Sequence, residues 1–262
     1  MKGLLVALNT ELIKALKSRM LWATIVFFSF IAVMLAFLML VAKNPEIAGN
    51  SEVIDMKASL ISKADWATYF GLLLQMVLTA GSLGPAIVTI WVFGREYSDR
   101  VIKDLLALPV SRFNIVFAKY IVIFFWSLLL LLLLYAIGLI SGLLIHLDGW
   151  NKELFLHKTQ VYFMSAFLTV LLFPVIAFLT CMSRGYLLPV GIAILILIVT
   201  QFVFIGFPGI TPYFPWAVPG LYSGIAGPAS PHPRGLSYMI IVLTSLSGSI
   251  GTALWWRFAD HH

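Results

Sequence analysis

Charged residues divide this chain into long apolar segments. Six segments contain no Asp, Glu, Lys or Arg and are long enough to cross a membrane. A helix rises about 1.5 Å per residue, so about 20 apolar residues cross a hydrocarbon core of roughly 30 Å. The six segments are Met20–Ala42, Trp66–Phe93, Tyr120–Leu147, Thr159–Ser183, Gly185–Pro233 and Gly235–Trp256.

The fifth segment is longer than one helix requires, and its second half is rich in Pro and Gly. Because Pro lacks an N–H and breaks helices, we expect a helix over about Tyr186–Gly206 followed by irregular structure. The pattern therefore predicts an all-α polytopic membrane protein. We expect six transmembrane helices that form a single transmembrane domain over 1–262.

The composition supports this class. Hydrophobic residues make up 61% of the chain and charged residues 11%, and the mean hydropathy is +1.01, outside the range of soluble domains. The first apolar run exceeds a signal-peptide core, so we expect a retained helix. Cys181 is the single cysteine and allows no intramolecular disulfide. The net charge is +6, but the sequence predicts no soluble basic domain that could bind a nucleic acid, so we expect no nucleic-acid partner.

The basic residues predict the orientation in the bilayer. With the N-terminus in the cytoplasm, eleven of the 17 Lys and Arg residues fall on the cytoplasmic side and six on the outer side. Lys and Arg are enriched in cytoplasmic loops. We therefore expect both termini to be cytoplasmic.

The first nineteen residues show a helical pattern of their own. Leu4, Leu8, Leu12 and Leu16 recur at every fourth position, and Lys14 is off that stripe. This spacing predicts an amphipathic helix over 1–19 that lies on the inner leaflet before the first crossing. A frayed basic terminus is the alternative.

A charged segment over 94–119 separates the second and third crossings. Glu96 and Arg100, Asp99 and Lys103, and Arg100 and Asp104 are opposite charges at helical spacing. An apolar stripe on the same segment is formed by Tyr97, Val101, Leu105 and Leu108. Pro109 cannot continue the helix, and Ser111 can cap the next one. We expect a short amphipathic helix under the membrane, and the alternative is a solvated loop that only enforces topology.

The segment EYSDRVIKDLLALPVSR, followed by AK, resembles the link between the second and third helices of ABC-2-type transporter permeases. That family has a Glu, then a short helix ending in Leu-Leu-x-x-Pro-x-Ser-Arg, and a later Lys. These places are occupied by Glu96, Leu105, Leu106, Pro109, Ser111, Arg112 and Lys119. Val101 and Ile102 stand where Gly-Thr is commoner. The chain as a whole resembles the compact bacterial members associated with bacitracin-type or lantibiotic resistance.

The resemblance implies a permease in the plasma membrane of a bacterial cell that exports a hydrophobic or amphipathic cargo. A peptide antibiotic and a lipid-linked molecule both fit that description. Two copies of an ABC ATP-binding subunit, and a second copy of the permease or a homologous permease, are the implied partners in the lipid bilayer. The chain contains no G-x-x-x-x-G-K-[ST] motif. We expect no cofactor on this chain, with ATP and Mg bound by the partner subunit.

By the same resemblance, the helix between crossings two and three is a coupling helix that docks into a groove of the ATP-binding subunit. An apolar ridge fills such a groove, and the flanking charges determine partner choice. The residues expected to couple are Glu96, Tyr97, Asp99, Arg100, Val101, Lys103, Asp104, Leu105, Leu108, Pro109 and Arg112.

The Pro-rich segment within 207–234 is too apolar for an ordinary water-exposed loop. Irregular backbone at membrane depth is tolerated only where protein or a water-filled cavity covers it. We expect a re-entrant hairpin at the outer mouth of the pathway, which the family resemblance also implies, and the alternative is a loop lying flat on the outer leaflet. The residues expected at this outer gate are Pro212, Tyr213, Phe214, Pro215, Trp216 and Pro219.

Other patterns favour packing over chemistry. Gly138 and Gly142 form a G-x-x-x-G motif, and Ser247 and Gly251 repeat the small-residue spacing in the last crossing. No ionisable residue lies deep in the six apolar segments, which disfavours a carrier coupled to protons or sodium. The chain also lacks H-E-x-x-H and a paired nucleophile, so we do not expect an enzyme. A membrane assembly subunit without transport remains an alternative.

Overall fold

The computed structural model describes residues 2–44, 46, 61, 63–99, 111–225, 227 and 230–258. Within these residues the protein is helical, and an isolated backbone bridge joins Asp65 and Asp148. Six of the described helical stretches are long and apolar enough to cross a membrane. The predicted all-α fold with six transmembrane helices is confirmed to that extent.

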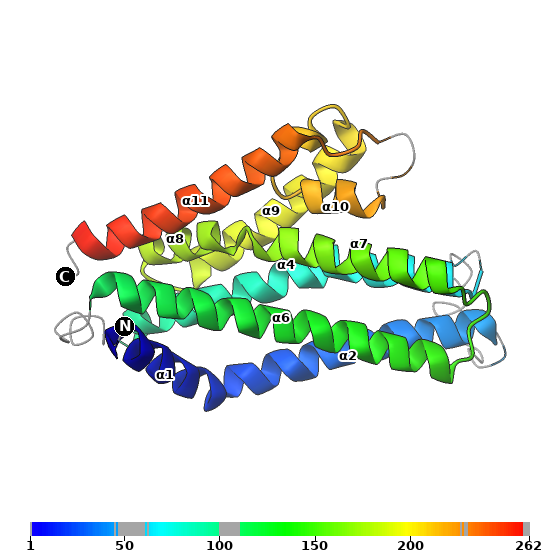
Figure 1. Ribbon diagram of the computed structural model, residues 1–262, viewed down its shortest axis with the longest axis horizontal. Coiled ribbons are helices and arrows are strands. Elements are labelled where there is room, and N and C mark those ends of the chain that lie inside the picture. The colour runs from blue at the N-terminus through cyan, green and yellow to red at the C-terminus, as the bar shows by residue number, and fades with distance from the viewer. Residues whose placement is uncertain are drawn as a thin grey trace.

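Ten elements make up the described part of the chain (Figure 1). They are α1 (Lys2–Leu16), α2 (Arg19–Lys43), α4 (Trp66–Ser98), α6 (Arg112–Leu144), α7 (Lys152–Val170), α8 (Phe173–Ser183), α9 (Leu187–Gly206), the 3-10 turn η2 (Thr211–Tyr213), α10 (Val218–Ser223) and α11 (Gly235–Phe258). Helices α7 and α8 together form the fourth crossing. The break between them precedes Pro174, which lacks the N–H that an unbroken helix requires.

Polar side chains begin four of the long helices. The side-chain oxygens of Ser18, Asp65, Ser111 and Asn151 accept hydrogen bonds from backbone N–H groups in the first turns of α2, α4, α6 and α7. Such caps satisfy N–H groups that have no partner within the helix. The capping role predicted for Ser111 is confirmed, with Asn114 N at 3.2 Å from its hydroxyl.

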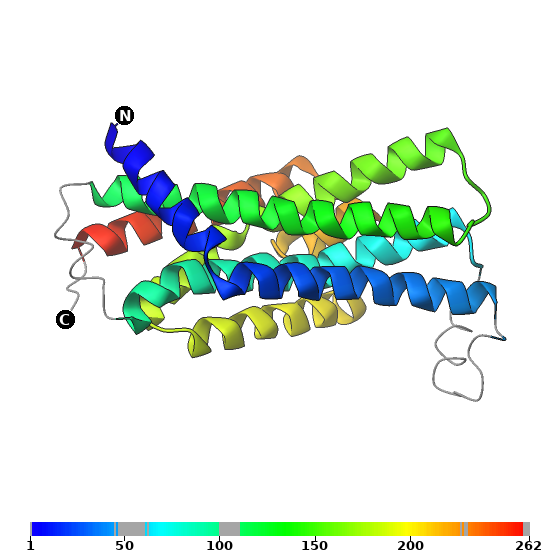
Figure 2. The ribbon, with the colours of Figure 1, turned by 90° about the horizontal axis from the view of Figure 1, so that it is seen from below.

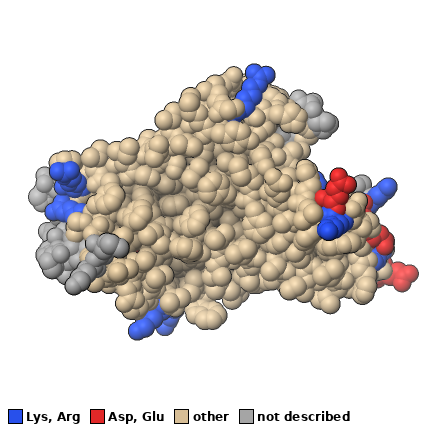
Figure 3. All heavy atoms as spheres, viewed as in Figure 1, with Lys and Arg blue, Asp and Glu red and all other residues tan. Residues whose placement is uncertain are grey.

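Helix α4 is the centre of the bundle, since it contacts α2, α6, α7, α8, α9 and α10. Figures 1 and 2 show the start of α1 and the end of α11 at one end of the molecule, which we call the inner end. The link between α6 and α7 lies at the opposite, outer end. On the face seen in Figure 3, most charged side chains lie towards these two ends, on either side of a broad uncharged band. This distribution suits a bilayer.

Glycines allow close contacts between several helices, among them α6 with α4. A Cβ on Gly138 would lie 2.7 Å from the Leu73 side chain, and one on Gly142 would lie 2.6 Å from Trp66. The G-x-x-x-G motif of α6 therefore packs against α4, as its spacing predicts. In α11 the structure agrees with the predicted packing at Gly251, where a Cβ would lie 3.0 Å from the Phe178 ring, but Ser247 is exposed. Gly248, which the spacing did not identify, packs against the backbone of Pro174.

Candidate functional site

Five charged side chains join three helices at the inner end of the bundle. We call this group the inner charge cluster. Its members are Glu11 and Lys14 of α1, Arg95 and Glu96 of α4, and Lys119 of α6.

Lys119 lies at the middle of the inner charge cluster. Its ammonium group donates to Glu96 Oε1 at 2.8 Å, to Glu11 Oε2 at 3.0 Å and to the Val92 carbonyl at 3.2 Å. Arg95 donates to Glu11 Oε2 at 2.6 Å. Each carboxylate is thus shared between cations from different helices, and the three helices are joined by charge-assisted hydrogen bonds.

The inner charge cluster is buried except for Lys14, whose side chain is 34% exposed. Lys119 is 0% exposed, Glu96 1% and Glu11 2%. Removing one partner of a buried ion pair typically costs about 3–5 kcal/mol, because the remaining charge stays buried without compensation. Burial alone would raise the pKa of Glu11, but Lys119, Arg95 and Lys14 outweigh it and hold that pKa below its ordinary value. The Glu11 carboxyl therefore stays ionised at neutral pH.

The inner charge cluster lies at the base of the segment predicted to couple. Helix α4 ends at Ser98 and α6 begins at Arg112, so the cluster joins the two helices that the segment connects. Glu96 is buried, and its carboxylate does not form part of a water-facing surface. Lys119, which occupies the place of the later Lys in the family pattern, is buried in the same way.

The other residues predicted to couple differ in where they lie. Tyr97 packs against the hydrophobic core, and Asp99 is exposed directly after α4. Arg112 donates to the backbone carbonyls of Trp256 and Arg257, at 3.0 and 3.1 Å, and so attaches the start of α6 to α11. The remaining predicted residues lie outside the described residues: Arg100, Val101, Lys103, Asp104, Leu105, Leu108 and Pro109.

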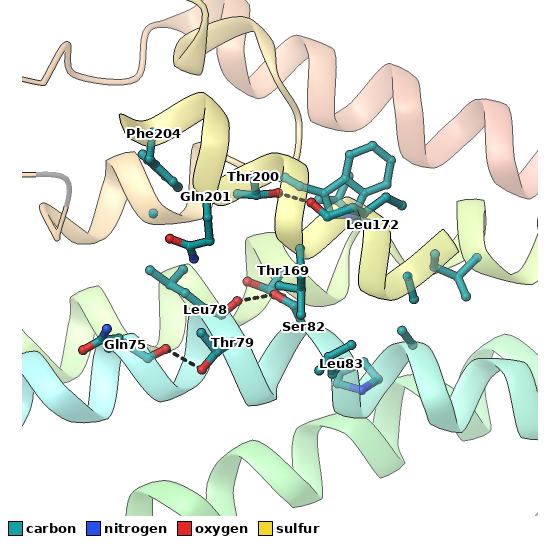
Figure 4. Close-up of a pocket in the computed structure, with 18 of the residues that line it drawn as sticks. Gln75, Leu78, Thr79, Ser82, Leu83, Thr169, Leu172, Thr200, Gln201 and Phe204 are labelled. Carbon is teal, nitrogen blue, oxygen red and sulfur yellow. Dashed lines mark hydrogen bonds between the residues drawn. The ribbon is translucent and has the colours of Figure 1, made fainter. Parts of the chain in front are cut away.

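A cavity of about 290 Å³ lies between α4, α7, α8 and α9, nearer the outer end than the charge cluster, and we call it the outer cavity. Figure 4 shows Gln201 of α9 directed toward α4, where Thr79 and Ser82 lie. The polar residues of its lining are Gln75, Thr79, Ser82, Thr169, Thr200 and Gln201. The rest of its lining is apolar, and none of the described residues that line it is ionisable.

The outer cavity is covered by packed side chains on two sides. Towards the inner end, a small cluster of Ala86, Ile90, Ile176 and Ala193 closes the space between α4, α8 and α9. Towards the outer end, Trp216 lines the cavity and packs with Leu168 and Leu172. The cavity opens to the surface of the bundle between α4 and α9, where the side chains of Gln75, Gln201 and Ile205 are exposed.

The segment predicted as an outer gate folds back onto the bundle. Helix α10 contacts α7 and α4, and Pro219 at its start is buried. The ring of Phe214 packs at a tilt against that of Trp216, with centroids 5.8 Å apart, whereas Tyr213 is 56% exposed. Pro212 and Pro215 are half-buried. Trp216 is thus the predicted gate residue that reaches the outer cavity.

Sequence reasoning missed Glu11 and the two glutamines. Glu11 is the single acidic residue before Glu46, and the other charged residues of the N-terminal segment are basic. This isolated acidic residue was the available signal. Gln75 and Gln201 stand alone in apolar segments. Isolated polar residues at membrane depth are costly and mark functional surfaces.

Comparison with known proteins agrees with this architecture. Residues 7–200 match the family model described as an ABC-2 family transporter protein. The chain is also similar to the bacitracin transport permease protein BCRB of Bacillus licheniformis. The two are 26% identical over 190 residues, which cover 72% of this chain and 89% of that protein.

Proposed function

The chain belongs to the ABC-2 family of transporter proteins, and from this premise we propose that it is the membrane-spanning permease subunit of an ATP-driven exporter. A separate ATP-binding subunit, with its Mg, hydrolyses the nucleotide. Two such subunits and a second permease copy complete the complex. Similarity to a bacitracin transport permease supports bacitracin or a related amphipathic peptide as the cargo.

The observation that carries this proposal is the bond between Lys119 and Glu96 at the base of the coupling segment. A push on that segment reaches α4 and α6 together, because their adjoining ends are joined by buried ion pairs. Helix α4 also lines the outer cavity. Movement at the inner end is therefore passed along α4 to the cavity.

Helix α1 takes part in the same mechanical unit. Glu11 bonds to both Arg95 of α4 and Lys119 of α6. The exposed face of α1 carries Leu5, Leu12 and Leu16, which suits contact with the inner leaflet. In this proposal α1 anchors the coupled helices at the membrane surface while the ATP-binding subunit moves.

The test is ATP-driven transport by the reconstituted complex. Inverted vesicles containing the permease and its ATP-binding subunit are given labelled bacitracin with ATP or with a non-hydrolysable analogue. We expect accumulation with ATP alone, and loss of accumulation when the permease carries Lys119→Met. Lys17→Met is the matched control, since Lys17 is exposed on the same side of the molecule. Equal accumulation with and without hydrolysable ATP contradicts the proposal.

A further inference from the structure

We infer that the outer cavity binds its cargo through uncharged groups that donate hydrogen bonds, such as peptide N–H groups joined to an apolar body, and that it discriminates against phosphate headgroups. This inference rests on the proposed permease function and specifies the cargo class at the cavity. It separates the two kinds of cargo, peptide and lipid-linked phosphate, that the family resemblance leaves open.

The first argument concerns the direction of the lining hydroxyl groups. Thr79 donates to the Gln75 carbonyl at 2.9 Å, and Ser82 donates to the Leu78 carbonyl at 2.7 Å (Figure 4). Thr169 and Thr200 bond in the same way to Ser165 and Ile196. A hydroxyl has a single proton, so each of these groups offers oxygen lone pairs to the cavity.

The second argument concerns the two amides. Among the described residues, no hydrogen bond joins the side chain of Gln75 or Gln201 to another group. An amide facing hydrocarbon without a partner is costly. Each amide offers two donors and one acceptor, and a peptide bond satisfies both functions. Two amides therefore line a site whose other polar atoms accept hydrogen bonds.

The third argument concerns charge. Among the residues that the structure describes, no Lys, Arg or His lines the outer cavity. An ionised phosphate is an acceptor of hydrogen bonds, and a phosphate site normally supplies cations or several N–H donors. Four hydroxyl oxygens that present lone pairs would repel such a group. An apolar body suits the remaining lining, which includes Phe204 and Trp216.

The size and the access of the outer cavity fit part of an amphipathic molecule. A volume of about 290 Å³ is at the lower end of the range for ligand sites. The cavity therefore accepts a short peptide segment or one large side chain, and the rest of the cargo lies outside it. The access between α4 and α9, past Gln75 and Gln201, leads to the side of the bundle.

The experiment measures equilibrium binding to the full-length permease in phosphatidylcholine nanodiscs, without the ATP-binding subunit. The experiment uses three labelled probes, each with a single twelve-carbon chain, which is dodecanoyl or dodecyl. The first carries Gly-Gly-amide, the second carries the fully N-methylated form of that dipeptide amide, and the third carries a phosphate. We expect saturable binding of the first probe. The N-methylated and phosphate probes should bind at least about tenfold more weakly, because two or more hydrogen bonds are lost.

Two variants assign the binding to this cavity. Gln201→Leu should weaken binding of the Gly-Gly-amide probe by about three- to tenfold, because about one hydrogen bond is lost. Gln160→Leu is the matched control and should leave the affinity unchanged, since Gln160 is exposed on α7 and does not line the cavity. Both substitutions replace an exposed polar group in a transmembrane helix by an apolar one, so the fold should persist in size-exclusion profiles.

The inference is overturned if the Gly-Gly-amide probe shows no saturable binding, or if the phosphate or N-methylated probe binds equally well. Equal effects of Gln201→Leu and Gln160→Leu also overturn it. Failure of the proposed function is distinguishable, because binding is measured without ATP. A permease that binds the amide probe but transports nothing with ATP would contradict the proposed function alone.

Discussion

The Lys119 ammonium of α6 lies 2.8 Å from the Glu96 carboxylate of α4, and both side chains are buried. This pair closes the base of the segment that connects the two helices. It also shares its charges with Glu11 of α1. Buried ion pairs are weak contributors to net stability, and we propose that this one holds α4 and α6 in a single relative arrangement. We regard that fixed arrangement as the requirement for passing a push from the coupling segment into the bundle.

Breaking the pair should be costly. Lys119→Met leaves two buried carboxylates with less compensation, and we expect a loss of about 3–5 kcal/mol in the free energy of unfolding. The measurement is the thermal unfolding midpoint in detergent, with Lys17→Met as an exposed control. The exchanged double variant, Glu96→Lys with Lys119→Glu, should recover part of the loss. A midpoint of Lys119→Met equal to that of the control would show that the pair does not hold the helices.

The stability that Glu11 contributes should depend on pH. The pKa of Glu11 is lowered in the folded protein, so its contribution is fully present above the ordinary value of 4.5 and is lost as the pH falls through the lower folded pKa. At pH 7 the wild type should therefore unfold at a higher temperature than Glu11→Gln. The difference between the two should shrink below pH 4.5. A difference that grows on acidification would contradict the ionised state of Glu11.

Close contact of α6 with α4 gives a steric prediction. A Cβ at Gly142 would meet the Trp66 ring at 2.6 Å, so Gly142→Val should destabilise the protein by about 1–3 kcal/mol through overpacking. Gly191→Ala is the control, because a Cβ at Gly191 meets nothing within 4 Å. Thermal unfolding midpoints compare the two. If Gly142→Val unfolds at the wild-type temperature, the contact is looser than the structure has it.

The uneven distribution of basic residues predicts the orientation in the bilayer. Asn151 lies exposed at the outer end and Ser98 lies exposed at the end of α4. In intact cells a membrane-impermeant maleimide should label Asn151→Cys and should not label Ser98→Cys. Cys181 is buried and should contribute little background. The reverse labelling pattern would invert the topology and place the coupling segment outside the cell.

Local sequence patterns predicted much of the fold. The six crossings, the cap at Ser111 and the contact through Gly138 and Gly142 each depend on residues close together in the chain. The inner charge cluster could not be predicted in this way. Glu11 meets Arg95 and Lys119, which are 84 and 108 positions away, and only the packing of α1 brings them together.

The same reason explains two further differences. Which face of α11 packs depends on the rotation of that helix against α8, so the spacing of Ser247 and Gly251 did not identify Gly248. The outer cavity is lined from α4, α7, α8, α9 and the segment around α10, and its six polar side chains come from α4, α7 and α9, which contribute three, one and two of them. No single stretch of sequence carries that pattern. The coupling surface itself stays a prediction for Arg100 to Pro109.

The central claim is that the segment after α4 couples an ATP-binding subunit to the bundle, and reversing the charges of Asp99 and Arg100 tests it most directly. Asp99 is exposed in the structure, and exposed pairs contribute at most about 1 kcal/mol, so the folded permease should persist. Like charges facing a docking groove cost several kcal/mol. We therefore predict that the variant Asp99→Lys with Arg100→Glu retains its unfolding midpoint, while co-purification of the ATP-binding subunit and bacitracin-stimulated ATPase activity fall sharply. Full co-purification and full stimulated activity in that variant would contradict the account.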